Sequence, residues 1–388
     1  MDVTRLVLKN WRNFRDVDVN LTRRTFLVGP NASGKSNLLD VFRFLHDIVR
    51  VGGGLAEAVR SRGGMKSLRC LAAAGMPAGV QVTVEVQGES ARWSYQLGFK
   101  AGAGKLSKFP VLITHEIVLR DGEKLLDRSE EVGDDSTDPE LRTQTELQQT
   151  AKNSSFRELR DFFDSIRYLH LVPQLIKHPQ AFSGANLRGD PFGLDFLETM
   201  ARTPEGTRKA RLKRIEDSLR AAVPQLKALS MEKDHAGVPH LRATYEHWRH
   251  HGAGQLETDF SDGTLRLIGL LWSLIDGVGP LLLEEPELSL HAAVVERLAP
   301  LIHRVQRKQG RQVIISTHSA GLLDNGVALE ELLLLRPDAQ KGTQVMPAGS
   351  EADAEALLNA GIPLGSIAIQ RTRAQRSKDL DGQMSLFN

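Results

Sequence analysis

This sequence of 388 residues lacks disulfide potential, long apolar runs and an excess of one charge. Its single cysteine, Cys70, cannot form an internal disulfide, which fits a reducing compartment and excludes a zinc site built from cysteines. No stretch approaches the ~18 consecutive apolar residues of a membrane-spanning helix, and the charged N-terminus has no apolar core of a secretory signal. We therefore expect a cytoplasmic protein with no membrane partner.

The charge balance makes any nucleic-acid surface a local feature. The chain has 50 Lys and Arg against 48 Asp and Glu, a net charge of +2. The most basic stretch is "TRKARLKRIED", on a predicted helix, with Arg208, Lys209, Arg211, Lys213 and Arg214. Such a run is usually a solvated face, and contact with the DNA backbone is the alternative that it leaves open.

The sequence also lacks internal repeats and any heptad pattern long enough for a coiled coil. Alternating apolar and polar residues predict strands and hairpins in the N-terminal part, and residues 190–226 have a helical pattern. Beyond Phe260 helix and strand alternate, which is typical of an α/β protein. We expect a β-rich N-terminal lobe within a domain spanning residues 1–348, a helical insertion at about residues 100–255, and a polar, irregular tail at 349–388.

A phosphate-binding loop is the most specific motif. The segment "GPNASGKS" matches G-x-x-x-x-G-K-[ST], follows the predicted strand "RTFLVG" and precedes an amphipathic helix. Its backbone amides can wrap a phosphate, Lys35 can reach the β- and γ-phosphate oxygens, and Ser36 can hold Mg²⁺. The motif predicts binding of ATP or GTP. The predicted nucleotide-binding residues here are Gly29, Asn31, Ser33, Gly34, Lys35, Ser36 and Asn37.

Hydrolysis of the nucleotide further requires acids near the phosphates, and "PLLLEEPE" supplies them at the end of an apolar strand. We assign Glu284 to Mg²⁺ and Glu285, with Lys35, to catalysis, where Glu285 polarises the attacking water. His318 follows the apolar strand "VIIST" and could meet the γ-phosphate. The alternatives are that the acids cap the next helix and that His318 is structural.

The order of these motifs carries a resemblance. The segments "LKNWRNFRDVDVNL", "GPNASGKSNLLD", "FSDGTLRL", "LLLEEPELSLH" and "VIISTHS" resemble the ABC-type ATPase heads of the RecF, SMC and OLD group. The chain looks most like the stand-alone ATPases of that group, which lack long coiled coils and a fused Toprim nuclease. The resemblance implies an α/β P-loop NTPase fold with a nucleotide site assembled from both ends of the chain.

The resemblance also implies further site residues. In such heads the signature turn binds the γ-phosphate held by the other subunit, so Ser261 and Gly263 would act across an ATP-dependent head-to-tail homodimer. Arg12 and Asn13 resemble the N-terminal residues that touch nucleotide, and "LSLH" resembles a loop that crosses the dimer interface. The metal-side acid, usually Asp, is Glu284 here. The glutamine that senses magnesium stays unassigned.

The function that we expect is an ATPase that acts on DNA or on a DNA-processing partner, such as a separate Toprim-like nuclease, in repair or in defence against foreign DNA. Two alternatives remain: the energising subunit of a transporter, and a scaffold that binds ATP without hydrolysing it. Near the C-terminus, Gln383, Leu386 and Phe387 lie in "QMSLF", which resembles a sliding-clamp-binding peptide. The alternative is that this pair of apolar residues folds back onto the protein surface.

Overall fold

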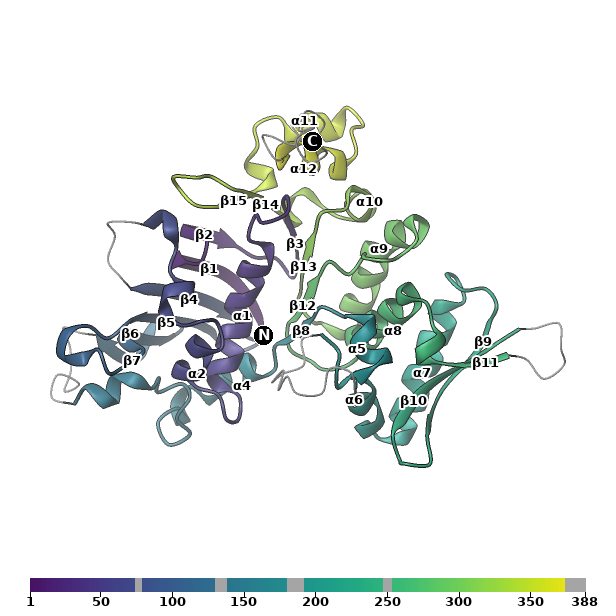
Figure 1. The fold of residues 1–388 in the computed structure, drawn as a ribbon. Helices are drawn as coiled ribbons and strands as arrows, with labels where there is room; N and C mark the ends of the chain where they lie inside the picture. The colour runs from purple at the N-terminus through teal and green to yellow at the C-terminus, as the bar shows by residue number, and fades with distance from the viewer. Residues whose placement is uncertain (74–78, 130–137, 180–191, 247–252, 374–388) are drawn as a thin grey trace, which may run out of the picture.

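The computed structural model describes residues 1–73, 79–129, 138–179, 192–246 and 253–373. Its described strands form three sheets, two of six strands and one of three strands. One six-stranded sheet, which contains β1 (Asp2–Trp11), lies at one side of the molecule, and the other, which contains β3 (Arg24–Val28), lies in the middle (Figure 1). The three-stranded sheet lies at the opposite side (Figure 1). The phosphate loop, the adjacent acids and His318 follow strands of the central sheet, whereas Arg12 and Asn13 lie in a turn of the first sheet.

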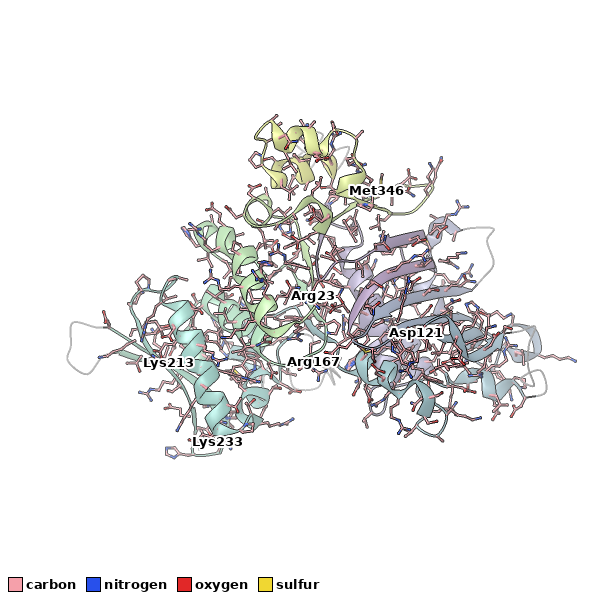
Figure 2. All side chains as sticks on the ribbon, turned by 180° about the vertical axis from the view of Figure 1, so that it is seen from behind. Arg23, Asp121, Arg167, Lys213, Lys233 and Met346 are labelled. Carbon is pink, nitrogen blue, oxygen red and sulfur yellow. The ribbon has the colours of Figure 1, made fainter. Side chains whose placement is uncertain are left out.

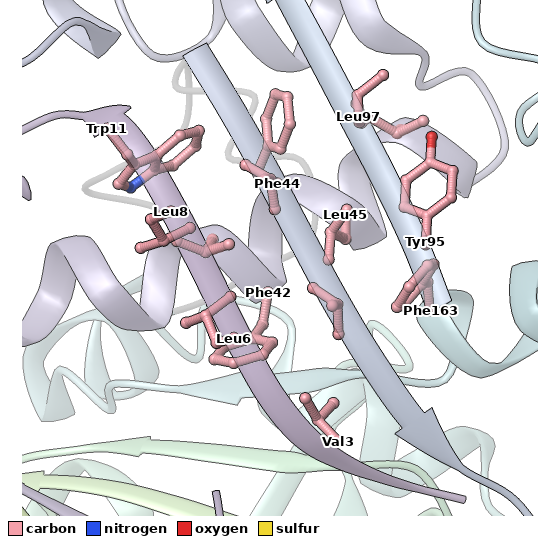
Figure 3. Packing of buried hydrophobic residues seen from close by; sticks show 14 of the residues in the cluster. Val3, Leu6, Leu8, Trp11, Phe42, Phe44, Leu45, Tyr95, Leu97 and Phe163 are labelled. Carbon is pink, nitrogen blue, oxygen red and sulfur yellow. The ribbon is translucent and has the colours of Figure 1, made fainter. Parts of the chain in front are cut away.

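The first sheet is antiparallel and has the strand order β2-β1-β4-β5-β6-β7. Its strands are β1 (Asp2–Trp11), β2 (Phe14–Asn20), β4 (Val80–Gln87), β5 (Arg92–Lys100), β6 (Leu112–Arg120) and β7 (Glu123–Ser129). One face packs on α1 (Lys35–Val49), where Trp11 meets Phe44 with ring centroids 5.2 Å apart (Figure 3). Strands β4 and β5 alternate buried and more exposed residues, so their pattern was readable in the sequence.

The central sheet is parallel except at one edge, and its order is β15-β14-β3-β13-β12-β8. Its strands are β3 (Arg24–Val28), β8 (Arg167–Leu169), β12 (Leu281–Glu284), β13 (Val313–Thr317), β14 (Leu332–Arg336) and β15 (Gln344–Pro347). Strands β3, β13 and β14 are almost wholly buried, as expected for a parallel sheet covered on both faces. Since β13 lies between β3 and β12 and all three are parallel, their carboxyl ends lie side by side at the same edge of the sheet.

Helices cover both faces of the central sheet. Leu282 and Ile314 belong to the core beneath α1 and α4 (Arg157–Asp164), whereas Leu283 and Ile315 belong to the core beneath α8 (Asp262–Ile275) and α9 (Ala292–Gln309). Further short helices are α2 (Leu55–Arg60), α3 (Met65–Leu68), α5 (Pro173–Lys177), α6 (Phe196–Arg202) and α10 (Ala320–Leu323). The sheet therefore separates two apolar layers.

The prediction that residues 100–255 form a helical insertion is wrong, because this region also contains strands. Strands β6, β7 and β8 fall within residues 100–255 but join the two large sheets. The rest includes α7 (Glu205–Leu219) and the third sheet, formed by β9 (Leu226–Lys233), β10 (Pro239–Tyr245) and β11 (Ala253–Leu256). Lys213 on α7 and Asp121 in the β6–β7 turn lie on opposite sides of the molecule (Figure 2). Local alternation reveals a strand but not the sheet that it joins.

The predicted irregular tail is wrong for its first part. Residues after Gly349 form α11 (Ala354–Asn359) and α12 (Leu364–Arg371), and Ile367 is buried. These helices are short, so their apolar residues show too few turns to reveal a helical period. Residues 374–388, including the clamp-like peptide, lie outside the described part. In the described part, every helix is too short or too polar to cross a membrane.

Candidate nucleotide-binding site

The phosphate loop runs from the end of β3 to the start of α1 and has left-handed backbone at two positions. Ala32 has φ 61° and Gly34 has φ 96°. A Cβ on Gly34 would lie 2.0 Å from the side-chain nitrogen of Asn13, so only glycine fits there. Because α1 begins at Lys35, the loop and the first helical turn form an anion site of the kind that holds phosphate.

Lys35 connects this loop to the acids of the central sheet. Its Nζ donates to the Gly29 carbonyl at 2.9 Å and to the Pro30 carbonyl at 3.2 Å. The same atom lies 3.8 Å from Oε1 of Glu285. Burial lowers the pKa of Lys35, and the nearby glutamates, Glu285 foremost, oppose that shift. The structure thus brings together two of the residues predicted for catalysis, Lys35 and Glu285, from distant parts of the chain.

Ser36 and Glu284 meet where a divalent cation was predicted. The Ser36 hydroxyl donates to Oε1 of Glu284 at 2.5 Å, and the Tyr168 hydroxyl donates to Oε2 of the same carboxylate. Burial raises the pKa of Tyr168, and the charge of Glu284 adds to this shift, so the hydroxyl stays a donor.

The oxygen donors fit Mg²⁺. This ion prefers oxygen ligands and commonly takes only one or two from protein, with phosphates and waters completing its octahedron. Ser36 and Glu284 supply a hydroxyl and a carboxylate side by side. Across the described ranges, no group of three or more His, Cys, Asp and Glu residues could hold a metal by itself. The donor set therefore suits a nucleotide-bound Mg²⁺ better than a metal held by protein alone.

Glu285 and His318 form a second pair at the carboxyl ends of β12 and β13. His318 Nδ1 lies 3.1 Å from Glu285 Oε1. The Glu285 backbone has φ 44°, a left-handed conformation that is costly for a residue with a side chain and is concentrated at functional sites. Its N–H donates to the Ser316 carbonyl at 3.0 Å, which fixes the turn. The turn places the carboxylate beside His318.

Glu287 is buried behind the turn, where it binds Thr317 on β13, and it does not cap a helix. It is 6% exposed, and its carboxylate accepts a hydrogen bond of 2.5 Å from the Thr317 hydroxyl. Burial raises the pKa of Glu287, and the bond from Thr317 opposes this shift. The N-cap of α9 is His291, which accepts from the backbone of Ala293 at 3.2 Å. The cap alternative is thus wrong for Glu287.

The turn between β1 and β2 braces the phosphate loop. The side-chain nitrogen of Asn13 donates to the Ser33 carbonyl at 3.0 Å, and its oxygen accepts from Asn37 at 2.9 Å. Arg12 instead forms a 2.7 Å ion pair with Asp40 on α1. Both residues therefore stabilise the geometry around the loop, and their predicted contacts with nucleotide stay predictions.

The signature turn lies at the start of α8 and joins a different part of the chain. Ser261 is the exposed N-cap of α8 and accepts from the Thr264 backbone at 3.2 Å. A Cβ on Gly263 would lie 2.5 Å from the carbonyl oxygen of Ser289, which has φ 62°. The signature turn and the "LSLH" loop therefore pack together. Within the described residues, no hydrogen bond or ion pair ties Ser261 or Gly263 to residues 29–36.

Sequence reasoning missed Tyr168. It lies in β8, whose three residues "RYL" are too few to show a strand period. The pairing of β8 with β12 places it near Glu284, and only the tertiary structure shows that pairing. Asn31, also predicted for nucleotide binding, is exposed on the loop.

The fold and the site define an ABC-type P-loop NTPase. A phosphate loop joins β3 to α1, two adjacent acids lie at the end of β12, and an exposed signature turn begins α8. Residues 24–324 match the family described as "AAA domain, putative AbiEii toxin, Type IV TA system". Because the match spans most of the chain, the protein belongs to this family of ATPases, and the predicted resemblance to RecF- and SMC-like heads is confirmed.

Solved structures agree on the fold. An SMC head bound to the C-winged helix domain of ScpA is 14% identical, with a TM-score of 0.51 over 89% of this chain and 97% of that chain. An SMC head domain from Thermotoga maritima is 15% identical, with a TM-score of 0.49 over 89% of this chain and 99% of that chain. No curated protein matches the sequence. The family match and the fold of the SMC head bound to ScpA confirm the predicted α/β fold of an ABC-type head.

Proposed function

We propose that this protein binds and hydrolyses ATP as a head-to-tail homodimer. The observation that carries the proposal is the meeting of Ser36 with Glu284, and of Lys35 and His318 with Glu285, at the carboxyl ends of β3, β12 and β13. These residues are far apart in the sequence, and a phosphate site with adjacent acids is the arrangement that phosphoryl transfer to water requires.

Each residue then has a separate task. Ser36 and Glu284 would hold Mg²⁺, which neutralises charge on the β- and γ-phosphates. Lys35 would bind the phosphate oxygens, and Glu285 would orient and polarise the attacking water. His318, 3.1 Å from Glu285, would hold that carboxylate in place and contact the γ-phosphate.

The dimer follows from the position of the signature turn. Ser261 is exposed, and Gly263 packs on the Ser289 carbonyl, so the turn and the "LSLH" loop present one surface. In a head-to-tail dimer this surface would face the phosphate loop of the other subunit, and the N-terminus of α8 would meet the γ-phosphate. ATP would then hold the subunits together until hydrolysis.

We further propose that the dimer acts on DNA through a partner protein, such as a separate Toprim-like nuclease, in repair or defence. The basic residues of α7 give little support to direct DNA contact, since Lys209 pairs with Glu205 at 2.6 Å and Arg211 with Asp276 at 2.6 Å. The related SMC head was solved with a domain of another protein, which supports docking of a partner.

Two variants test the proposal. Glu285→Gln should bind ATP and elute as a dimer with ATP and Mg²⁺, because water activation is lost while the γ-phosphate still bridges the subunits. Lys35→Ala should remain a monomer under the same conditions. The measurements are size-exclusion chromatography and steady-state phosphate release, with the exposed Glu330→Gln as matched control.

The outcomes separate the alternatives. Wild type that releases phosphate while Glu285→Gln does not supports the ATPase. Wild type that binds ATP without releasing phosphate would show a non-hydrolysing scaffold, and identical elution of the two variants would exclude the ATP-dependent dimer. Phosphate release measured with duplex, single-stranded and end-containing DNA then tests the DNA role, since a rate unaffected by all three would argue against direct action on DNA.

A further inference from the structure

The acid at the predicted metal site is a glutamate where such heads usually have an aspartate. Glu284 has one more rotatable bond than aspartate, so an unrestrained side chain would spread over more rotamers. In this structure neither carboxylate oxygen is free: Oε1 accepts from Ser36, and Oε2 accepts from Tyr168. The two hydroxyls hold the longer side chain from opposite sides.

The sheet places Tyr168 where it can make this contact. Strand β8 runs parallel to β12, and Tyr168 lies opposite Leu282 in the register. Glu284 is two residues beyond Leu282, and side chains two apart in a strand point to the same face. Tyr168 and Glu284 are therefore diagonal neighbours on the face that α1 covers. A long aromatic side chain can span this distance to reach the carboxylate.

The ring itself is fixed by the helix that begins at the phosphate loop. The guanidinium carbon of Arg43 lies 4.3 Å from the centre of the Tyr168 ring, close enough for a cation–π contact. Tyr168 also packs at the edge of the apolar core beneath α1. Since α1 carries both Ser36 and Arg43, one helix positions both hydroxyl groups that contact Glu284.

We propose that Tyr168 is a positioning residue for the Mg²⁺ site, holding Oε2 of Glu284 so that Oε1 faces the metal beside Ser36. This inference rests on the proposed nucleotide-binding function. Ser36 and Glu284 would hold the ion, and the bond from Tyr168 would orient the carboxylate. Partners of this kind, which contact a ligand rather than the metal, typically affect metal affinity about 10- to 100-fold.

The test is Tyr168→Phe, which removes only the hydroxyl. With ADP bound, Mn²⁺ affinity measured by electron paramagnetic resonance should fall about tenfold, while ADP affinity in EDTA should equal that of wild type. The matched control is Tyr95→Phe, because the Tyr95 hydroxyl also donates to a buried carboxylate, that of Glu116, at 3.1 Å. This control should leave Mn²⁺ affinity unchanged, since it lies outside the site.

The same substitution made in a second parent protein, Glu284→Asp, distinguishes a positioning role of Tyr168 from a general loss of structure. In Glu284→Asp the shorter carboxylate withdraws from the hydroxyl, so adding Tyr168→Phe should change Mn²⁺ affinity less than about twofold. Unchanged Mn²⁺ affinity in Tyr168→Phe, or an equal loss in both backgrounds, would overturn the inference and leave the proposed ATPase intact. Wild type that binds no nucleotide would overturn both. Wild type that binds Mn²⁺ with ADP but releases no phosphate would leave the inference standing.

Discussion

At the scale of single residues, two buried acids near the site behave in opposite ways. Burial alone would raise the pKa of Asp40, but Arg62, and after it Arg12, outweigh burial and lower the pKa. Arg62 makes ion pairs of 2.9 Å with both Asp40 and Asp47 while remaining 5% exposed. Among the described residues no arginine pairs with Glu287, and burial raises its pKa. The arginines that pair with Asp40 make the difference, and they make Asp40 a source of stability at neutral pH.

We expect Asp40→Asn to lower the free energy of unfolding at pH 7 by about 3 kcal/mol, because it removes the main partner of a buried arginine. The folded-state pKa of Asp40 is depressed, so its contribution is present above the unfolded-state pKa and is lost as pH falls through the folded-state pKa. Urea unfolding measures the free energy of unfolding of wild type and of Asp40→Asn at pH 7 and at about pH 3. The difference between the two proteins should be smaller at the lower pH.

The control for this variant is Asp18→Asn, which removes an exposed ion pair with Arg5. It should cost less than about 1 kcal/mol at either pH, because water screens exposed pairs. A loss in Asp40→Asn that is the same at both pH values would show that packing, rather than charge, makes Asp40 stabilising.

At the scale of elements, α8 combines a polar start with an apolar body. Its first turn is capped by Ser261 and is solvent-accessible, whereas Leu265, Leu270 and Trp272 are buried. The helix is therefore held by its body, and its N-terminus is available to a second subunit. This arrangement allows substitution at the first turn without removal of the core contacts.

Ser261→Arg should abolish turnover yet keep the ATP affinity of the isolated subunit within about twofold, because the signature turn acts across the proposed interface. Fluorescent-nucleotide binding and phosphate release measure the two quantities. Ser261→Ala is the companion variant that reports loss of the helix cap alone, which costs about 1 kcal/mol.

Mixing Ser261→Arg with Lys35→Ala gives a sharper measurement, since one composite site in the mixed dimer pairs two intact halves. Recovery of phosphate release in the mixture would support action in trans. If Ser261→Arg loses ATP binding as a monomer, the signature turn acts in its own subunit and the proposed geometry is incorrect.

At the scale of the whole molecule, the two large sheets are joined by buried polar contacts. Gln312 is 1% exposed, accepts from the Val3 backbone at 2.8 Å and donates to the carbonyl oxygens of Val3 at 2.7 Å and Thr22 at 3.0 Å. Within the central sheet, Arg24 on β3 pairs with Glu331, just before β14, at 2.6 Å while 5% of the Arg24 side chain is exposed. These contacts connect segments from opposite ends of the chain, so the nucleotide site forms only when both ends are folded.

Recruitment of the whole molecule is a separate prediction, carried by Gln383, Leu386 and Phe387 outside the described residues. A peptide ending in "QMSLFN" should bind purified sliding clamp, with the two apolar side chains in a pocket. Leu386→Ala with Phe387→Ala should weaken binding at least about tenfold, or about 1.4 kcal/mol, by isothermal titration. Equal binding by both peptides, or binding by neither, would discard the clamp site without affecting the ATPase proposal.

The sequence determined the chemistry and the local elements. The phosphate loop, the pair Glu284 and Glu285, and the capped start of α8 were readable because each depends on neighbours within a few residues. The same holds for the β1–β2 hairpin, whose alternation matches the observed antiparallel register. The predicted order of elements along the central sheet region was enough to give the fold class.

The tertiary structure alone decided which segments meet. It joined β8 to β12 and so brought Tyr168 to Glu284, tied Arg12 to Asp40, and placed Gly263 against Ser289. It also assigned β6 and β7 to the first sheet and folded part of the expected tail into α11 and α12. The physical reason is that such pairings depend on burial and strand order across the whole chain, and short segments such as β8 carry no local signal of their partners.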